Sequence, residues 1–247
     1  MSEAWTEGDS ETFLREADCF VPERELLVQS ICRLVPDPPL KLDQGADLVV
    51  ELCCGDGTLA EAVLEAHQDA RVLALDASDS MLEACARRTE RFGSRIEVRR
   101  FDLGAEDWRR FAEPVRAVVS TFAIHHLNDS AKRRLFVEMA EALAPGGALV
   151  IADLVKPLGE AATGLAAWQW DEAVRERSIL LRGDLSGLDA FRSHRWNHHA
   201  LEIPDPIDRP APLLEQLHWF VQAGLEHVNV HWTKGGMSLF SGVKPSV

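Results

Sequence analysis

The stretch Leu48–Ala60 reads LVVELCCGDGTLA. An apolar run that contains one carboxylate, Glu51, is followed by two cysteines, and two glycines then lead into a helical pattern. Glycines between a strand and a helix let the backbone approach a ligand beside the helix N-terminus. A buried carboxylate is costly unless it is paired, so Glu51 predicts a polar ligand above this turn.

Strand and helix patterns alternate after this stretch, and several of the expected strands are continuously apolar. Strands are expected over residues 46–53, 71–78, 95–103, 115–123 and 148–153. Helices are expected over 58–67, 78–92 and 130–144, the last ending at the sequence PGG. Continuously apolar strands are typical of a parallel sheet covered on both faces. The alternation therefore predicts an α/β fold with a doubly wound, mostly parallel sheet.

The flanking segments differ from this core. Residues 11–35 are expected to be helical with a break at Pro22, and residues 36–45 read as a linker. Residues 157–210 are rich in tryptophan and histidine and are interpreted as an inserted helical segment followed by a loop. A helix over 212–224 and two β-like runs around a glycine turn predict a terminal antiparallel hairpin.

Composition bounds the possible partners and the compartment. The chain has 247 residues and a net charge of −14, which disfavours nucleic acid as a partner. The arginines between Arg87 and Arg110 alternate with acidic residues and are interpreted as a solvated, mixed-charge face. The five cysteines form no CxxC pair, which argues against a disulfide framework and agrees with a reducing compartment. No apolar run reaches the roughly 20 residues of a membrane span, and the acidic N-terminus does not resemble a secretory signal, so a cytoplasmic location is expected.

Carboxylates follow the next two strands as well. Asp76 ends the second strand and could accept two hydrogen bonds from a ribose diol, and Asp102 follows the third strand over the same crevice. The sequence GDGTLA also fits a dinucleotide fingerprint, which keeps an NAD-dependent oxidoreductase as a rival interpretation. Glu51, Asp102 and the terminal hairpin count against that rival.

The motifs VVELCCGDG, LALDAS, RFDL, VVSTFAIHHL and APGGALVIAD, followed by the hairpin, resemble the class I S-adenosylmethionine-dependent methyltransferase family. The resemblance covers residues 45–155 and 211–245. It implies a seven-stranded sheet in one domain: an N-terminal helical lid (1–44), a cofactor-binding core (45–156), a substrate-side insertion (157–210) and a C-terminal helix and hairpin (211–247). The first glycine of the family's glycine block is replaced by Cys53 in this chain.

The resemblance also implies cofactor contacts for S-adenosyl-L-methionine and its product S-adenosyl-L-homocysteine. Glu51 would lie near the ammonium group, Asp76 would bind the ribose hydroxyls, and Asp102 would accept from the adenine amino group. Gly55 and Gly57 would give the methionine portion access to the backbone. The remaining implied contacts are Cys53, Ala77, Met81, Leu103 and Thr121.

Catalytic candidates follow the fourth and fifth strands. His125 and His126 are the best placed general bases, and only one of them is expected to face the pocket if the backbone there is extended. Asp153 ends the fifth strand and would orient the substrate or a histidine, or else serve as a cap or loop residue. Packing roles for the two histidines remain an alternative.

The insertion and the N-terminal helices are expected to form the acceptor pocket. Trp168 and Trp170 would stack on a flat substrate or pack in the core. Phe13, Phe20 and Arg24 would belong to the lid. The histidines of the sequence HRWNHH, which are His194, His198 and His199, offer no complete ligand set and are interpreted as a surface cluster, so no metal is expected.

The sequence thus predicts methyl transfer to a small-molecule acceptor, with no nucleic acid and no membrane as partner. Two alternatives stay open: a protein that binds S-adenosylmethionine without transferring the methyl group, and an enzyme that makes a modified S-adenosylmethionine. The NAD-dependent oxidoreductase is the more distant rival. A homodimer is left open as the state of assembly.

Overall fold

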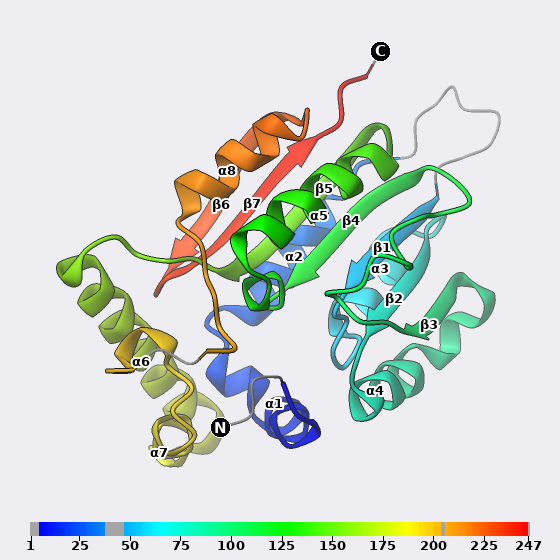
Figure 1. Ribbon diagram of the computed structural model, residues 1–247. Coiled ribbons are helices and arrows are strands. Elements are labelled where there is room, and N and C mark those ends of the chain that lie inside the picture. Colours follow the sequence, from blue (N-terminus) through cyan, green and yellow to red (C-terminus); the bar gives the residue numbers. More distant parts are fainter. Residues whose placement is uncertain (1–4, 38–46, 204–205, 247) are drawn as a thin grey trace.

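The computed structural model describes residues 5–37, 47–203 and 206–246, which form a central sheet with helices on both faces (Figure 1). The strands are β1 (Leu48–Leu52), β2 (Arg71–Asp76), β3 (Ile96–Arg100), β4 (Val115–Thr121), β5 (Leu143–Leu154), β6 (Glu226–Lys234) and β7 (Met237–Val243). The helices are α1 (Glu7–Phe20), α2 (Arg24–Leu34), α3 (Thr58–Ala66), α4 (Asp79–Thr89), α5 (Asp129–Ala142), α6 (Glu160–Arg182), α7 (Ser186–Ser193) and α8 (Leu213–Gln222). Short 3₁₀ turns are η1 (Glu90–Arg95), η2 (Ile124–His126) and η3 (His198–Ala200).

The seven strands lie in the order β3-β2-β1-β4-β5-β7-β6. Strands β1 to β5 run parallel, while β7 pairs antiparallel with both β5 and β6. The order changes direction at β1, which lies between β2 and β4, so the crevice at the carboxyl end of β1 is a topological switch point. The predicted doubly wound, mostly parallel sheet with a C-terminal antiparallel hairpin is confirmed.

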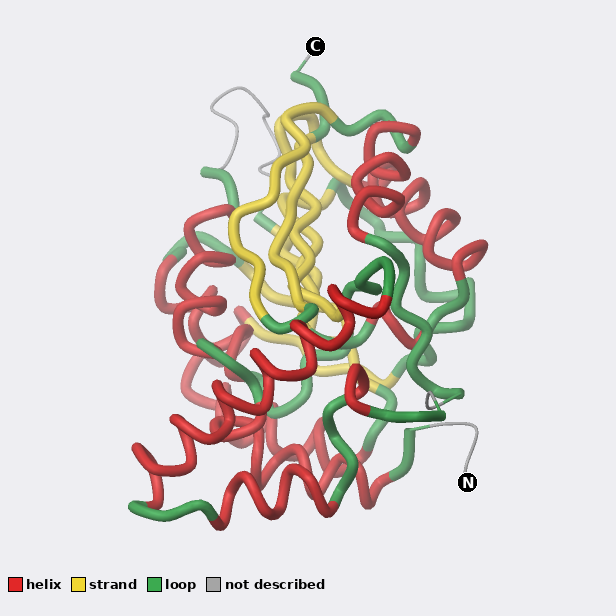
Figure 2. Tube along the Cα trace, turned by 90° about the vertical axis from the view of Figure 1, so that its left-hand side faces the viewer, coloured by secondary structure: helices red, strands yellow, loops and turns green. Residues whose placement is uncertain are grey.

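Alternating residues of each strand feed two separate cores. Val50 and Val118 point to the face covered by α5 and α8, where Phe136 and Trp219 pack. Their neighbours point to the opposite face, which α2, α3 and α4 cover. Figure 2 shows helices on both sides of the sheet. Because both faces are buried at the centre of the sheet, β1, β2 and β4 are largely apolar, as the sequence pattern predicted for several strands, whereas the edge strands β3 and β6 are mostly polar and exposed.

A third layer lies across the carboxyl ends of the parallel strands. It consists of α1, α6 and α7, which pack through a small core of their own that includes Phe20, Trp170 and Phe191 (Figure 1). The predicted helical insertion over 157–210 is therefore confirmed as α6, α7 and η3. This layer closes the crevice where the loops after β1, β2 and β4 meet.

Several expected boundaries moved. Helix α1 begins at Glu7, earlier than expected, because Thr6 and Asp9 form a capping box there. The break at Pro22 is confirmed, between α1 and α2. Helix α5 ends at Ala142, two residues before its expected end, because β5 starts at once and runs through the PGG sequence. Most of the expected linker, residues 38–45, and part of the loop after η3, residues 204–205, lie outside the described residues.

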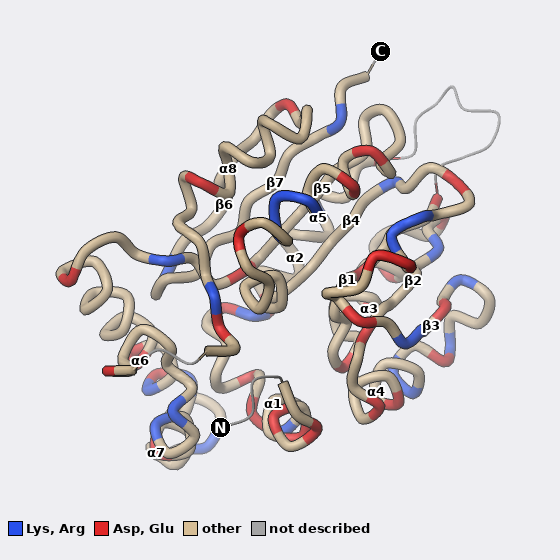
Figure 3. Tube along the Cα trace, in the orientation of Figure 1, with Lys and Arg blue, Asp and Glu red and all other residues tan. Residues whose placement is uncertain are grey.

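Basic and acidic residues alternate along residues 87–110, as predicted for a mixed-charge face (Figure 3), and most of these arginines form ion pairs. Arg88 contacts the carboxylates of Asp56 and Glu61 at 2.9 and 3.1 Å, and Arg91 contacts Glu61 at 3.0 Å. All five cysteines are free thiols, which confirms that the chain has no disulfide framework. Among the described residues, no helix combines the length and the apolar character that crossing a membrane requires.

Candidate active site

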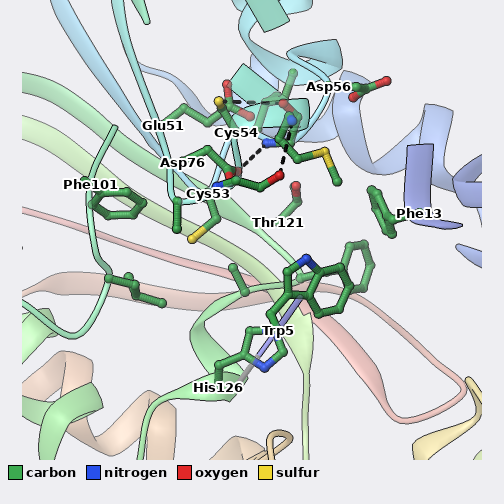
Figure 4. Close-up of a pocket in the computed structure, with 18 of the residues that line it drawn as sticks. Trp5, Phe13, Glu51, Cys53, Cys54, Asp56, Asp76, Phe101, Thr121 and His126 are labelled. Carbon is green, nitrogen blue, oxygen red and sulfur yellow. Dashed lines mark hydrogen bonds between the residues drawn. The ribbon is translucent and has the colours of Figure 1, made fainter. Parts of the chain in front are cut away.

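A cavity of about 570 Å³ lies at the carboxyl ends of β1, β2 and β4 (Figure 4). Its volume is in the range of small-molecule and cofactor pockets. The predicted cofactor contacts that line it are Glu51, Cys53, Gly55, Asp76, Ala77, Met81, Asp102, Leu103 and Thr121. These predicted contacts therefore lie together around one cavity of cofactor size.

The glycine turn contains residues in the left-handed backbone conformation, and these residues serve two different functions. Cys53 has a φ of 56°, a conformation that glycine adopts more readily, and Gly55 has a φ of 54°. A side chain at Gly55 would project beside Met81 in the cavity, at 3.9 Å from its sulfur. Gly57, in contrast, is not among the residues that line the cavity, which corrects its predicted role. A Cβ at Gly57 would lie 2.7 Å from the sulfur of Cys85, so this glycine permits close packing of the turn on α4.

Glu51 is 1% exposed at the end of β1. Its Oε2 has no hydrogen-bond partner within the part of the chain that the structure describes. Burial, and then the neighbouring groups Cys85, Asp56 and Asp76, raise the pKa of this carboxyl well above its ordinary value. An acceptor atom of this kind, buried at the wall of a cavity, fits a cationic ligand group.

Asp76 holds the glycine turn in place. Its Oδ2 accepts a hydrogen bond from the Gly55 amide at 2.9 Å, and its Oδ1 accepts from the Ser78 amide at 3.0 Å. Ser78 caps α4, because its hydroxyl accepts a hydrogen bond from the Met81 amide. Burial raises the pKa of Asp76. Its carboxylate therefore organises the turn and also faces the cavity, where the ribose contact was predicted.

Asp102 lies at the more open end of the cavity, after β3. Its Oδ1 accepts from the Gly104 amide at 2.8 Å, which forms a turn beside Leu103. Of the two carboxylates predicted to bind the nucleoside, Asp76 is buried and Asp102 is exposed. Asp102 therefore combines a turn role with a position on the cavity wall.

Helix α1 and the residues before it cover the cavity. Trp5 and His126 lie opposite Glu51 and Asp76, with 5.6 Å between the Trp5 and His126 ring centroids (Figure 4). Phe13 lines the cavity as well. Phe20, which was expected in the lid, is instead fully buried against Phe191 and Trp196 in the third core, because it lies on the inner face of α1.

Two charged contacts attach this cover to the core. Glu7 accepts a hydrogen bond from the Asp79 amide at 3.0 Å and one from the Ser78 hydroxyl at 2.9 Å, so α1 is attached to the N-terminus of α4. Arg24, which was expected in the lid, lines the cavity and contacts the Asp56 carboxylate in the glycine turn at 2.8 Å. The cover is therefore tied to the glycine turn and to α4.

The two predicted histidines lie on a 3₁₀ turn rather than on an extended backbone. His126 lines the large cavity, whereas His125 is buried and lines a second, adjacent cavity. Asp153 is 1% exposed. Its Oδ1 lies 2.5 Å from Nδ1 of His125, and its Oδ2 accepts from the His125 amide at 2.7 Å. Of the roles left open for Asp153, the structure supports orientation of a histidine.

Asp208 completes this polar group and was missed in the sequence. Its Oδ1 lies 3.3 Å from Nε2 of His125 and 3.3 Å from Nδ1 of His126, and its Oδ2 lies 3.4 Å from Nδ1 of His198. Burial lowers the pKa of His125, but Asp153 and Asp208 outweigh it and raise that pKa to about 10. No local pattern marks Asp208, because it lies in an irregular loop far along the chain from the histidines.

The second cavity, of about 160 Å³, adjoins the first and shares Trp5, Phe13, Phe122 and Ile207 with it. Trp170 lines it, while its indole N–H donates to the Phe20 carbonyl at 2.8 Å. Trp168 is 61% exposed on α6 and lines neither cavity, so its predicted stacking role is wrong. Two residues that are two positions apart on a helix point about 200° apart, and only Trp170 faces inward.

The expected surface cluster of histidines is also corrected. His199 is 8% exposed and approaches the Gly236 carbonyl at 3.3 Å. The ring of His198 is largely buried beside Asp208. His194 lines the second cavity. The three histidines therefore have different surroundings. His198 and His199 are largely buried rather than exposed on the surface.

Comparison with known proteins agrees with this geometry. Residues 49–147 match the family model described as a methyltransferase domain. An uncharacterized methyltransferase of Geobacillus kaustophilus is 29% identical over 111 residues, which are 45% of this chain and 48% of that protein. A carboxy-S-adenosyl-L-methionine synthase of Cronobacter sakazakii is 30% identical over 113 residues, or 44% of each chain. The chain thus spans about half the length of the curated relatives it matches.

Among solved structures, an O-methyltransferase family protein from Burkholderia thailandensis aligns with a TM-score of 0.58 and 19% identity, over 89% of this chain and 57% of that one. At this identity the likeness concerns the fold. The matched segment contains the glycine turn and the carboxylates that follow β1, β2 and β3. Residues 49–147 therefore match a methyltransferase domain, and the strand order with its antiparallel β7 agrees with that match.

Proposed function

We propose that this chain binds S-adenosyl-L-methionine and transfers its methyl group to a small-molecule acceptor, releasing S-adenosyl-L-homocysteine. The observation that carries the proposal is the orphaned Oε2 of Glu51 at the wall of the large cavity. The bound methyl donor supplies an ammonium group for this carboxylate and an activated sulfonium methyl for the reaction. Gly55 leaves room for the donor where another residue would place a side chain beside Met81.

The chain's own residues are proposed to align the reactants and exclude water. Trp5, Phe13 and Phe122 border both cavities, so they separate the donor from solvent near the junction. In the transfer, the acceptor's lone pair forms a bond to the methyl carbon, and the electron pair of the broken carbon–sulfur bond remains on sulfur. Holding reactants in line in this way can contribute roughly 7–11 kcal/mol to catalysis.

His125, His126 and Asp153 are proposed to act on the reactive group of the acceptor. Asp153 orients His125, while His126 is the imidazole that faces the donor cavity. A protonated acceptor group would lose its proton to His126. Asp153 and His125 then act as positioning residues, because they hold in place the polar group that they form with Asp208.

The second cavity supports a small acceptor. Its volume of about 160 Å³ is below the range of drug-sized ligand pockets, and aromatic side chains form much of its wall. We propose that the insertion supplies this acceptor side and that α1 and α2 act as a lid over the donor. The homodimer and the cytoplasmic location stay predictions.

One alternative product has a specific observation behind it. The Cronobacter relative is a carboxy-S-adenosyl-L-methionine synthase by name, and its match covers 44% of this chain. A chain with that activity would add mass to the donor instead of passing on the methyl group. The product's mass therefore separates the two activities.

The test uses the full chain, a donor labelled in its methyl group, and the small-molecule fraction of a cell extract. We expect label in a new small molecule and an equal amount of S-adenosyl-L-homocysteine by mass spectrometry. A chain that binds the donor in calorimetry but moves no label would be a binding protein. Label in RNA, or a heavier donor, would contradict the proposed acceptor, and binding of NAD in place of the donor would favour the oxidoreductase.

A further inference from the structure

His125, His126 and Asp208 bring one potential ligand atom each to the junction of the two cavities, and these atoms all lie within 4.8 Å of one another. We infer that this group, with His198 beside it, is a binding site for a divalent transition-metal ion such as Zn²⁺ or Co²⁺. The sequence predicted no metal, because it considered only the histidines of the insertion. The ligand set joins two side chains of η2 to one from the loop before α8.

The distances suit a coordination shell. Nε2 of His125 and Nδ1 of His126 both lie 3.3 Å from Oδ1 of Asp208. Charge-assisted hydrogen bonds between nitrogen and a carboxylate are typically about 2.7–2.9 Å. Ligands held at about 2.1 Å from a tetrahedral ion lie about 3.4 Å from each other. Two imidazoles around one carboxylate oxygen are therefore spaced as neighbouring ligands of an ion.

The lone pair of His125 is directed to the site by a second carboxylate. Asp153 contacts Nδ1 of His125 at 2.5 Å, so the proton of a neutral ring lies on Nδ1 and Nε2 is free to bind a metal. A carboxylate behind a metal-binding histidine is a common arrangement in zinc sites, where it fixes the ring and raises its basicity. This gives Asp153 a positioning role that does not depend on direct contact with the ion.

A third nitrogen points to the same carboxylate. Nδ1 of His198 is buried and has no hydrogen-bond partner among the described residues, and it lies 3.4 Å from Oδ2 of Asp208. The weak contact of His126 Nδ1 with the Ile207 carbonyl, at 3.4 Å, is the competing use of that nitrogen. An ion would satisfy the imidazole of His198 as well as those of η2.

The protein backbone holds the two halves of the site together. The amide of Arg209 donates to the His125 carbonyl at 2.8 Å, which places Asp208 beside the histidines. The buried ammonium of Lys132 donates to the Leu127 carbonyl at 2.5 Å and also to the Arg209 carbonyl. Since these contacts do not involve the ligand atoms, the site is assembled before any ion arrives.

The chemistry of the ligands defines the class of ion. Imidazole nitrogens with a single carboxylate favour borderline ions such as Zn²⁺, Co²⁺, Ni²⁺ or Fe²⁺ over Mg²⁺ and Ca²⁺. His125 and Asp208 line the acceptor cavity, so the ion would face an oxygen, nitrogen or sulfur atom placed there. This last role, in which the ion acidifies the acceptor in place of an imidazole base, rests on the proposed function; the binding of the ion does not.

The test titrates the chelator-treated full chain with Co²⁺ and follows the visible absorption band, with Zn²⁺ binding measured by calorimetry. We expect one equivalent of Co²⁺ to bind. Asp208→Asn and His126→Gln remove ligands and should lower Co²⁺ affinity at least 100-fold. Asp153→Asn leaves the ligands in place and should lower it about 10–100-fold. His218→Gln, at an exposed histidine on α8, is the matched control and should bind Co²⁺ as the unmodified chain does.

Circular dichroism melts and donor binding are measured on the same variants. Asp208 does not line the donor cavity, so Asp208→Asn should keep its affinity for S-adenosyl-L-methionine while it loses Co²⁺. Unchanged Co²⁺ affinity in a folded Asp208→Asn or His126→Gln variant would overturn the metal site. So would failure of the unmodified chain to bind either ion at micromolar concentrations. Methyl transfer by an unmodified chain that binds neither ion would leave the proposed function intact and refute only the metal site.

Discussion

Replacing Glu51 with glutamine should weaken donor binding and stabilise the empty chain. These two effects have opposite signs because the buried Glu51 carboxylate contributes to ligand binding and does not stabilise the fold. Its Oε2 has no hydrogen-bond partner among the described residues, so the empty protein bears the cost of an unpaired buried acceptor. Glutamine keeps the size of the side chain and removes its charge.

The size of each effect follows from these contacts. Losing one charge-assisted contact to the donor's ammonium group costs about 1.5–3 kcal/mol, which is about a 10–150-fold loss of affinity. Removal of the unpaired buried carboxylate should raise the free energy of unfolding of the ligand-free chain by about 1–3 kcal/mol. For a protein of this length, each kcal/mol raises the melting temperature by roughly 2–4 °C.

The stabilisation should depend on pH. The pKa of Glu51 in the folded chain is raised well above its ordinary value of 4.5, so the folded state holds this proton more tightly than the unfolded state. The contribution of Glu51 to the stability of the unmodified chain is therefore fully present below about pH 4.5. This contribution is lost as the pH rises through the raised pKa. The Glu51→Gln variant lacks this loss, and its advantage should grow from acidic to neutral pH.

Isothermal calorimetry with S-adenosyl-L-methionine measures the affinity, and differential scanning calorimetry between pH 5 and pH 8 measures stability. Glu215→Gln, at an exposed position of α8, is the control and should change neither quantity. A Glu51→Gln chain that melts at a lower temperature without ligand would show that the carboxylate stabilises the fold. Unchanged donor affinity would remove Glu51 from the binding site.

Three further changes test the surroundings of the site. Gly57→Ala should destabilise the chain by about 1–3 kcal/mol, because the new Cβ would meet the Cys85 sulfur at 2.7 Å in a left-handed backbone; a melting temperature equal to that of the unmodified chain would contradict this packing. Asp153→Asn removes one member of a buried ion pair with His125 and should cost about 3–5 kcal/mol in denaturant unfolding, whereas an unchanged midpoint would mean that the pair adds nothing to stability. Trp5→Ala should lower kcat/KM for the acceptor about 2–10-fold through lost aromatic contact and leave the melting temperature within about 2 °C, since Trp5 is 40% exposed; full activity would remove Trp5 from the boundary of the cavities.

The donor side could be predicted from the sequence because its residues are local to the strands that carry them. Glu51 and Asp76 end neighbouring parallel strands, and the glycine turn joins β1 directly to α3. The carboxyl ends of parallel strands meet at one edge of the sheet, so strand patterns alone bring these groups together. The role of Gly57 was not predictable in the same way, because its neighbour Cys85 comes from a different helix.

The acceptor side could not be predicted to the same extent. A helical insertion was visible in the pattern, but Trp168 and Trp170 have similar chemistry, and only the phase of α6 decides which one is buried. The neighbours of His125 come from β5 and from the loop before α8, and only Asp153 had a strand pattern to place it. Side chains in irregular loops follow no period, so Asp208 had no signal in the sequence.

The donor side and the acceptor side of the site are therefore held by different contacts, so a mutation can alter one side and leave the other unchanged. The donor turn depends on contacts within the glycine segment and on Asp76, while the polar group at the acceptor depends on the loop that Arg209 and the buried Lys132 attach to η2. Substitutions in residues 157–210 can alter the acceptor cavity without touching the donor turn. Binding of S-adenosyl-L-methionine and choice of acceptor should accordingly respond to separate sets of mutations, with Trp5 and His126 as the side chains that affect both.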